Sequence, residues 1–254
     1  MYAWYNDIDP YVCQWVRNLI KTKLITDGEV DERPIQDVRP IDLKPFTRCH
    51  FFCGIAGWEL ALRQADFPTD RQVWTGSCPC QPFSAAGQAR GFDDERHLWP
   101  FWFHLIDVCR PPTLFGEQVA NGAGLWLDLV LADLESADYA VGAAVLPAAG
   151  VGAPHKRERF WFVADAAEHG CEGLQRGAKA QVSQDGPPQA LGTWNDAGNP
   201  FNDWQKLLAE SHVVRVDDGV SSSLDIRPRL HAYGNAIVPQ VAAEFITAYL
   251  SCRP

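Results

Sequence analysis

The sequence predicts an α/β fold with a mostly parallel sheet. Two observations support this prediction, namely the apolar runs of strand length and the segments with helical spacing between them. Short apolar runs of strand length alternate with longer segments whose apolar residues recur at helical spacing. Strands and helices that alternate in this way form a sheet covered by helices on both faces. The length of 254 residues suits one large domain, or one domain with a small appendage.

The predicted elements can be placed in order along the chain. Strands are expected where short apolar runs are bounded by turn-forming residues, at 2–5, 50–53, 73–75, 113–115 and 160–164, with a further apolar stretch at 140–146. Helices are expected where apolar residues recur every three or four positions, at 11–23, 58–65, 99–108 and 125–137. The polar residues 26–44, rich in Asp, Glu and Pro, separate the first helix from the second strand.

The composition changes after residue 165. From 166 to about 202, Gly, Gln, Ala and Pro prevail and large aliphatic residues are few, which is typical of a loop-rich insert or a small subdomain. We therefore predict a main domain over 1–165 and a reduced insert over 166–226. A C-terminal segment over 227–254 then returns to the main domain with a final helix.

The overall composition excludes several classes of protein. Lys and Arg number 22 and Asp and Glu 32, and the formal net charge of −10 excludes a generic basic coat for nucleic acid. No apolar run reaches membrane-spanning length, and the N-terminus lacks a basic segment followed by an apolar core. The eight cysteines form no paired Cys-x-x-Cys motifs. We therefore expect a cytoplasmic protein with reduced thiols, no metal site and no membrane contact.

Two features indicate a small-molecule site at the ends of the first strands. Phe52-x-Gly54-x-x-Gly57 lies between a strand and a helix, where glycines let a ligand approach the backbone. Asp7 and Asp9 follow the first strand, and an acid at a strand end can hold ribose hydroxyls. Each feature also has an ordinary explanation, because a lone Gly-x-x-Gly is usually a tight turn and Asp9 can serve as a helix cap.

A more specific signal is the segment Pro-Cys-Gln-Pro-Phe-Ser at 79–84. Cys80 stands in a loop at the end of a strand, which suits a nucleophilic thiolate that needs access and a depressed pKa. Glu117 ends another strand, and a carboxyl group beside a thiolate in a dry pocket can keep its proton and act as an acid. Arg157 and Arg159 can bind an anion or a pyrimidine carbonyl, although such charge runs are usually only solvated.

Together these segments resemble the C5-cytosine methyltransferase family. The glycine turn, the Pro-Cys-Gln-Pro-Phe-Ser segment, Glu117 with Val119, the two arginines and Gly-Asn-Ala at 234–236 match the family's motifs in type and order. The sequence is similar to compact phage- and prophage-encoded members of the family. The resemblance implies a Rossmann-like domain that uses S-adenosylmethionine and acts on double-stranded DNA as a monomer.

The resemblance also implies a role for individual residues. Cys80 would be the nucleophile that adds to C6 of a flipped-out cytosine, after which C5 takes the methyl group. Glu117 would hold N3 and the exocyclic amine, and Arg159, with Arg157 less directly, the O2 side. The residues placed around the cofactor are Phe52, Gly54, Ile55, Gly57, Asp7, Ile8, Asp31, Pro79, Leu98 and Asn235.

The sequence departs from the family's motifs at three positions. Ala56 stands where the turn usually has a second adjacent glycine, and its methyl group is expected to narrow the approach to the backbone. Gln118 replaces the Asn after the Glu, which leaves the loop-bracing role of that Asn open. His155 replaces the Gln ahead of the arginines and can also donate and accept hydrogen bonds.

The order of the motifs also differs from that of most members. The ribose-binding acid usually follows the glycine turn, but the fitting segment around Asp7 precedes it here. We therefore predict a local permutation, in which strands two and three of the sheet come first and strand one follows at 50–53. Asp31 would then contact the adenine, with Glu29 or Asp37 as alternatives.

The insert lies where such enzymes carry a target-recognition domain, here reduced to about sixty residues. Lys156, Arg157 and Arg159, with Arg90 and Arg96, could supply a local basic cleft. Three alternatives to DNA methylation are methylation of a tRNA cytosine, a weak or inactive methyltransferase-like protein that binds DNA, and transfer of a different group from a modified cofactor.

Overall fold

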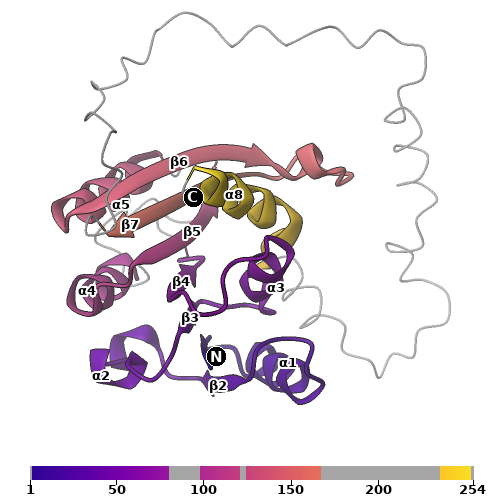
Figure 1. The fold of residues 1–254 in the computed structure, drawn as a ribbon, viewed down its shortest axis with the longest axis vertical. Helices are drawn as coiled ribbons and strands as arrows, with labels where there is room; N and C mark the ends of the chain where they lie inside the picture. Colours follow the sequence, from indigo (N-terminus) through magenta and orange to yellow (C-terminus); the bar gives the residue numbers. More distant parts are fainter. Residues whose placement is uncertain (1, 80–97, 121–123, 167–234, 253–254) are drawn as a thin grey trace, which may run out of the picture. The chain divides into compact units, whose positions relative to one another are not determined.

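A seven-stranded sheet organises the part of the chain that the structure describes. The computed structural model describes residues 2–79, 98–120, 124–166 and 235–252, which belong to one compact unit. The strand order is β2-β1-β3-β4-β5-β7-β6 (Figure 1). Neighbouring strands from β2 to β5 are parallel, whereas β7 runs antiparallel to β5 and β6. The predicted α/β fold with a mostly parallel sheet is therefore confirmed.

The elements have the following bounds. The strands are β1 (Ala3–Asn6), β2 (Gly28–Asp31), β3 (Arg48–Phe51), β4 (Val73–Gly76), β5 (Thr113–Val119), β6 (Tyr139–Pro147) and β7 (Glu158–Ala166). The α-helices are α1 (Pro10–Lys21), α2 (Pro40–Leu43), α3 (Gly57–Gln64), α4 (Trp99–Cys109), α5 (Gly124–Ser136) and α8 (Pro239–Ser251). Two 3-10 turns are η1 (Ile35–Asp37) and η3 (Ala148–Val151).

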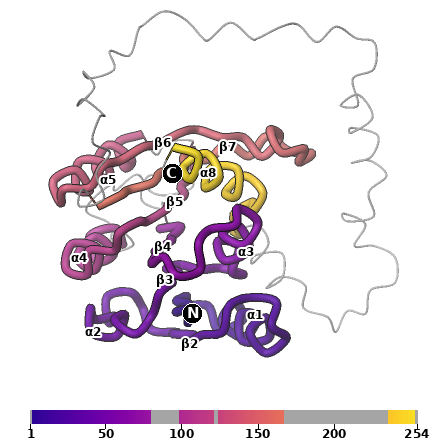
Figure 2. Tube along the Cα trace, in the orientation of Figure 1, coloured from indigo at the N-terminus to yellow at the C-terminus, as the bar shows by residue number. Residues whose placement is uncertain are grey.

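Helices cover both faces of the sheet. Helices α3 and α8 pack with Phe115 and Trp161 of the sheet, and α1 packs with Tyr5 on the same side. Helices α2, α4 and α5 pack on the other side, against Phe51 and Trp74. Figures 1 and 2 show the two layers on either side of the strands. This is the arrangement predicted from the alternation of strands and helices.

The predicted local permutation is also confirmed. Strand β1 lies between β2 and β3, with Tyr5 opposite both Val30 and His50. The first two strands of the chain thus extend the sheet beyond the strand that carries the glycine turn. Strand β2 is an edge strand in the polar stretch 26–44, and Val30 is its only aliphatic residue. A solvent-facing edge needs little apolar surface, which explains its weak strand signal.

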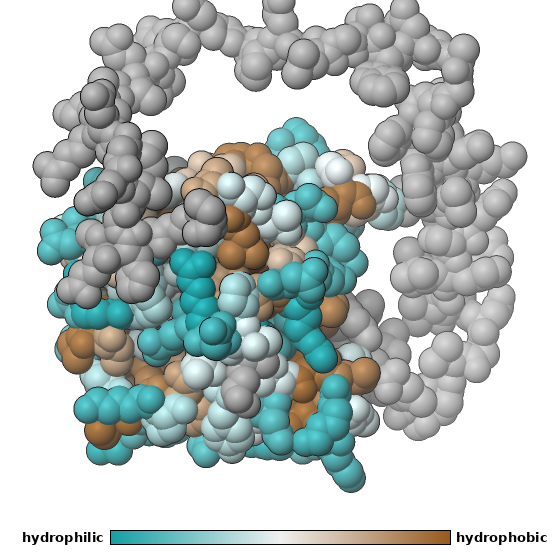
Figure 3. All heavy atoms as spheres, viewed as in Figure 1, coloured by the Kyte–Doolittle hydropathy of each residue, from teal (hydrophilic) through white to brown (hydrophobic). Residues whose placement is uncertain are grey.

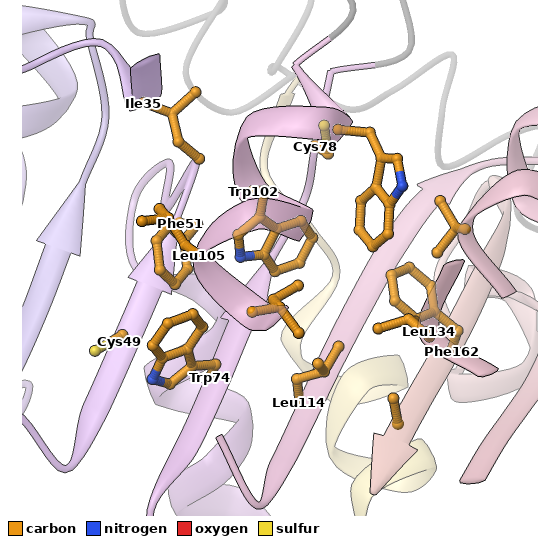
Figure 4. Close-up of a cluster of buried hydrophobic side chains, with 14 of the residues drawn as sticks. Ile35, Cys49, Phe51, Trp74, Cys78, Trp102, Leu105, Leu114, Leu134 and Phe162 are labelled. Atoms are coloured by element: carbon orange, nitrogen blue, oxygen red, sulfur yellow. The ribbon is translucent and has the colours of Figure 1, made fainter. Parts of the chain in front are cut away.

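The largest hydrophobic cluster lies between the sheet and helices α4 and α5. Figure 4 shows Trp102 of α4 among Phe51, Trp74 and Leu114. The Phe51 and Trp102 rings have centroids 5.6 Å apart. Gly76 of β4 lies beneath Trp102, and a Cβ atom there would stand 2.5 Å from Cη2 of the indole. The glycine therefore allows the indole to lie directly on the strand.

A buried ion pair fastens α3 to the other face of the sheet. Nη1 of Arg48 lies 3.0 Å from both carboxylate oxygens of Glu59, and both side chains are almost completely buried. His50 and Thr26 also bond to this carboxylate. Burial alone would raise the pKa of Glu59, but the hydrogen bond and charge of His50 and the charge of Arg48 lower it to about 2. The carboxylate is therefore ionised under all ordinary conditions.

The surface in view mixes hydrophilic and apolar residues (Figure 3). Within the described ranges, none of the helices has the length and apolar character needed to span a membrane. The predicted insert over 166–226 lies outside the described residues, except for Ala166. The predicted boundaries at 165 and 227 therefore stay predictions.

The contact between Gly76 and Trp102 leads to a first prediction. Gly76→Ala should lower the free energy of unfolding by about 1–3 kcal/mol, because the added methyl group overpacks the core beneath the indole. Urea unfolding followed by tryptophan fluorescence measures this change. Gly142→Ala on β6 is the matched control, since its nearest contact would be an ordinary 3.7 Å to Val163. Equal stability of the two variants would contradict the prediction.

Candidate active site

The turns that follow β1 and β3 meet at one edge of the sheet. The backbone N–H of Gly54 donates to Oδ2 of Asp7 over 3.0 Å, and the N–H of Asp9 donates to Oδ1 of the same carboxylate over 3.0 Å. The N–H of Cys53 bonds to the carbonyl of Asn6 over 2.9 Å. Burial raises the pKa of Asp7, although these N–H groups oppose the rise. The permutation predicted this contact between Asp7 and the glycine turn.

The glycine turn has an unusual backbone. Phe52, Gly54 and Ala56 have φ values of 49°, 51° and 65°, in the left-handed region. Ala56 is buried and belongs to a hydrophobic cluster with Tyr5 and Val16. Its methyl group thus lies in the core, which differs from the expectation that it narrows the approach to the backbone.

The end of β2 lies beside this turn. Nδ2 of the buried Asn6 donates to the carbonyls of Asp31 and Arg33, over 3.0 and 2.8 Å. The carboxylate of Asp31 pairs with Nη2 of Arg33 at 2.6 Å, and Arg33 also pairs with Asp42 at 3.0 Å. A hollow of about 450 Å³ is lined by these three charged side chains and by Trp4, Arg17, Glu29, Val30 and Glu32. The predicted adenine contact Asp31 and its alternative Glu29 both line it.

The loop after β4 is braced from β5. Nε2 of Gln118 donates to the carbonyl of Cys78 over 2.8 Å, while its Oε1 accepts from the N–H of Val119 over 2.9 Å. The Gln118 side chain is buried. Although it is longer than the Asn found here in the family's motif, its amide braces the loop that leads to Pro79. The predicted nucleophile Cys80 is the next residue and lies outside the described residues.

A buried acid stands beside this loop. Glu117 pairs with Nε of Arg159 at 2.9 Å, across the antiparallel strands β5 and β7. Only 7% of Glu117 is exposed. Burial raises its pKa, and this outweighs the charges of Arg159 and Arg157 and hydrogen bonds from Ser77 and Arg159. A carboxyl group in this setting can exchange a proton with a ligand.

Arg157 connects this acid to the C-terminal segment. Its Nη2 donates to the carbonyl of Ala236 over 2.7 Å, and its φ of 39° is left-handed. Ile237 packs on Gly57, where a Cβ atom would lie 2.7 Å from Cγ1 of the isoleucine. The segment before α8 therefore joins the glycine turn to Arg157, whose guanidinium is partly committed to the backbone.

The other predicted residues occupy varied positions. Ile8 is 65% exposed, and Asn235 and His155 are also exposed. Four other predicted cofactor residues are half-buried, namely Phe52, Ile55, Pro79 and Leu98. Of these, Leu98 lies just before α4 and packs against the hydrophobic cluster around Trp102. Lys156 pairs with Glu158 at 3.0 Å, while Arg90 and Arg96 lie outside the described residues. Asp37 ends η1 and is exposed. The described ranges hold no group of three His, Cys, Asp or Glu placed to bind a metal ion.

Two residues of this site were not predicted from the sequence. Asn6 ties the ends of β1 and β2 together, and its position next to Asp7 at a strand end was the available signal. Ser77 lies between β4 and Cys80, and its hydroxyl accepts from Nε1 of Trp58 over 3.1 Å. Nothing in the residue pattern distinguishes this serine from an ordinary loop serine.

The chain matches one protein family and several known proteins. The family model for C-5 cytosine-specific DNA methylases matches residues 60–196. Type II methyltransferase M.NlaX of Neisseria lactamica is 36% identical over 104 residues, which are 39% of this chain and 33% of that protein. M.BsuFI of Bacillus subtilis is 29% identical over 171 residues, 65% of this chain and 41% of that protein.

Two further matches are similar in extent. M.MspI of a Moraxella species is 37% identical over 134 residues, 48% of this chain and 32% of that protein. The solved structure of a mutant of Spodoptera frugiperda DNMT2 has a TM-score of 0.45 and 18% identity, over 69% of this chain and 45% of that chain. The matches to M.NlaX, M.BsuFI and M.MspI thus span about a third to two fifths of the length of those relatives.

The burial of Glu117 leads to a prediction about pH. Its pKa is raised above the unperturbed 4.5, so the folded state loses stability as the pH rises through the folded pKa. Glu117→Gln cannot ionise and escapes this loss. The free energy of unfolding of the variant minus that of the wild type should therefore increase from pH 4.5 to about pH 8. Urea titrations at both pH values measure this difference. A decrease would contradict the prediction, because it would mean that Arg159 and Arg157 outweigh burial and lower the pKa of Glu117.

Proposed function

The chain belongs to the C-5 cytosine-specific DNA methylase family, and we propose that it transfers a methyl group from S-adenosylmethionine to C5 of a cytosine in double-stranded DNA. The observation that supports this proposal most strongly is the pair of Glu117 and Arg159. A buried carboxyl group and a guanidinium stand 2.9 Å apart beside the loop that leads to Cys80. Such a pair can recognise one edge of a pyrimidine, because it combines a proton-exchanging group with a fixed donor.

The edge formed by β1, β2 and β3 fits the cofactor. Asp7 offers a carboxylate held in place by two backbone N–H groups, as a ribose-binding acid requires. Ile8 presents an exposed apolar side chain next to it, which can cover an adenine ring, and Asp31 lines the adjoining hollow. Phe52, Gly54 and Gly57 would complete the cofactor site together with Asn235. When bound, S-adenosylmethionine supplies an electrophilic methyl group.

The residues of this chain would prepare the cytosine for that methyl group. The Cys80 thiolate adds to C6 of the ring, which makes C5 nucleophilic. Protonated Glu117 donates to N3 and accepts from the exocyclic amine, so that charge developing on the ring is stabilised. Arg159 binds the O2 side, and Arg157, which is held by the carbonyl of Ala236, supports it. Loss of the C5 proton, followed by loss of the cysteine, restores the aromatic ring.

The DNA must be distorted for this chemistry to occur. A cytosine stacked in a duplex cannot reach a buried carboxyl group, so we propose that the base is flipped out of the helix. Residues 166–226 would form the reduced recognition region. With a net charge of −10, the protein depends on local cations for DNA affinity, and Lys156 is an exposed one among the described residues.

Transfer of labelled methyl groups tests this proposal. Wild-type protein and Cys80→Ala are incubated with labelled S-adenosylmethionine and either mixed-sequence duplex DNA or tRNA. We expect the wild type to label DNA and Cys80→Ala to lose at least a thousandfold in rate, because the covalent step is removed. Cys252→Ala is the matched control, since that cysteine is exposed at the end of α8. It should keep the wild-type rate.

The other outcomes separate the alternatives. Labelling of tRNA but not DNA would favour an RNA cytosine methyltransferase. Cofactor binding without labelling of either nucleic acid would favour a different transferred group. Absence of cofactor binding would favour a DNA-binding protein without catalytic activity. Equal labelling by wild type and Cys80→Ala would refute the covalent mechanism.

The position of Ala56 leads to a prediction about cofactor affinity. Its methyl group packs with Tyr5 and Val16 in the core, so Ala56→Gly should change the Kd for S-adenosylmethionine by less than about threefold. Stability should also change little, because relief of the left-handed alanine, about 1–2 kcal/mol, opposes the loss of a buried methyl group, about 0.8 kcal/mol. Calorimetric titration measures the Kd, and a tenfold tighter complex would contradict the prediction.

A further inference from the structure

Trp58 makes a specific hydrogen bond in the core. It is the second residue of α3, is 1% exposed, and donates from Nε1 to Oγ of Ser77 over 3.1 Å. Burial alone does not require such a bond. Four other buried tryptophans of the described chain have an indole N–H without a hydrogen-bond partner, namely Trp74, Trp102, Trp126 and Trp161.

The chemistry of the two groups fixes the direction of the next bond. An indole N–H can only donate, so Oγ of Ser77 must accept from Trp58. The serine hydroxyl has a single proton, which is then available to another acceptor. Gly76 pairs with Gly116 across the parallel strands β4 and β5, so the next residues, Ser77 and Glu117, are neighbours with side chains on the same face. A hydrogen bond from the Ser77 side chain is among the influences that lower the pKa of Glu117. Ser77 therefore donates to the Glu117 carboxyl, and Trp58 holds the hydroxyl in the rotamer that does so.

We propose that Ser77 is a positioning residue for Glu117 and that Trp58 sets the direction of its hydroxyl. This inference rests on the proposed function, in which Glu117 receives the cytosine. Trp58 follows Gly57 directly, so the relay from Trp58 through Ser77 to Glu117 connects the proposed cofactor turn to the proposed base-binding acid. Nε of Arg159 holds Oε1 of the same carboxyl group.

The relay also affects proton binding at Glu117. Among the residues that the structure describes, the charged groups that act on this carboxyl are Arg159 of β7 and Arg157 just before that strand, and both favour the ionised form. A hydrogen bond donated by Ser77 favours the ionised form as well, whereas burial favours the neutral form. Removing the Ser77 hydroxyl should therefore raise the pKa of Glu117 further. If protonated Glu117 is the active form, the basic limb of the activity profile moves to higher pH.

Three variants and one direct measurement test the relay. The carboxyl carbon of Glu117 is followed by carbon-13 NMR against pH and assigned with Glu117→Gln, which needs neither DNA nor cofactor. We expect Ser77→Ala to raise the pKa of Glu117 by about 0.5 to 1, the value of one ordinary hydrogen bond. Trp58→Phe should raise it by less, because the serine keeps its proton but loses its orientation. Ser77→Thr should titrate like the wild type, because threonine keeps the hydroxyl group.

Trp102→Phe is the matched control for loss of a buried indole. Its N–H has no hydrogen-bond partner among the described residues, and its indole packs on β4 from the opposite face. It should leave the titration of Glu117 unchanged. A folded Ser77→Ala protein that titrates like the wild type would overturn the proposal, as would equal shifts in Trp58→Phe and Trp102→Phe.

The pH profile of methyl transfer supplies an independent readout. In Ser77→Ala we expect the basic limb to move to higher pH by the same amount as the pKa of Glu117 measured by NMR. We also expect a lower kcat, because the carboxyl group is less well oriented. An unshifted limb together with a shifted NMR titration would overturn the role of Ser77 in the reaction. Absence of methyl transfer in the wild type would refute the proposed function, while the NMR titration would still decide whether the relay exists.

Discussion

The buried ion pair between Arg48 and Glu59 fixes the position of α3, and both halves of the candidate site depend on that position. The two side chains are almost fully removed from solvent, so loss of either partner leaves an uncompensated charge, which costs about 3–5 kcal/mol. Gly57 at the start of α3 closes the glycine turn, and Trp58 reaches the loop after β4. One polar contact inside the protein thus sets the geometry of two surface loops.

The topology explains how the site tolerates a permuted chain. Parallel strands end at the same edge of a sheet, so Asp7 after β1 and Gly54 after β3 meet whichever strand is made first. The reversed direction of β7 has a complementary effect. Its first residues lie beside the last residues of β5, which places Arg159 opposite Val119 and within reach of Glu117. Spatial order, not chain order, decides which side chains converge.

Much of this arrangement could be predicted from the residues, and the failures have physical causes. Strand and helix alternation predicted the sheet, and the displaced acid predicted the contact of Asp7 with Gly54. Strand β2 gave little signal because an edge strand needs few apolar residues. The brace from Gln118 to Cys78 and the bond from Trp58 to Ser77 depend on side-chain reach in three dimensions, which residue patterns do not encode. The roles assigned to Cys80 and to the cofactor residues remain predictions.

The C-terminal helix has a consequence for the biosynthesis of the protein. Helix α8 lies beside α3 (Figure 1). It shares a hydrophobic cluster with Trp58, Phe115 and Trp161, and Ile237 packs on Gly57. Helix α8 leaves the ribosome only after the sheet and α3 have emerged, because chains are made from the N-terminus. Until then a broad aromatic surface is open to water, and the glycine turn lacks its cover. The nascent chain is therefore exposed to aggregation, and to capture by chaperones, in the interval between the emergence of the sheet and the emergence of α8.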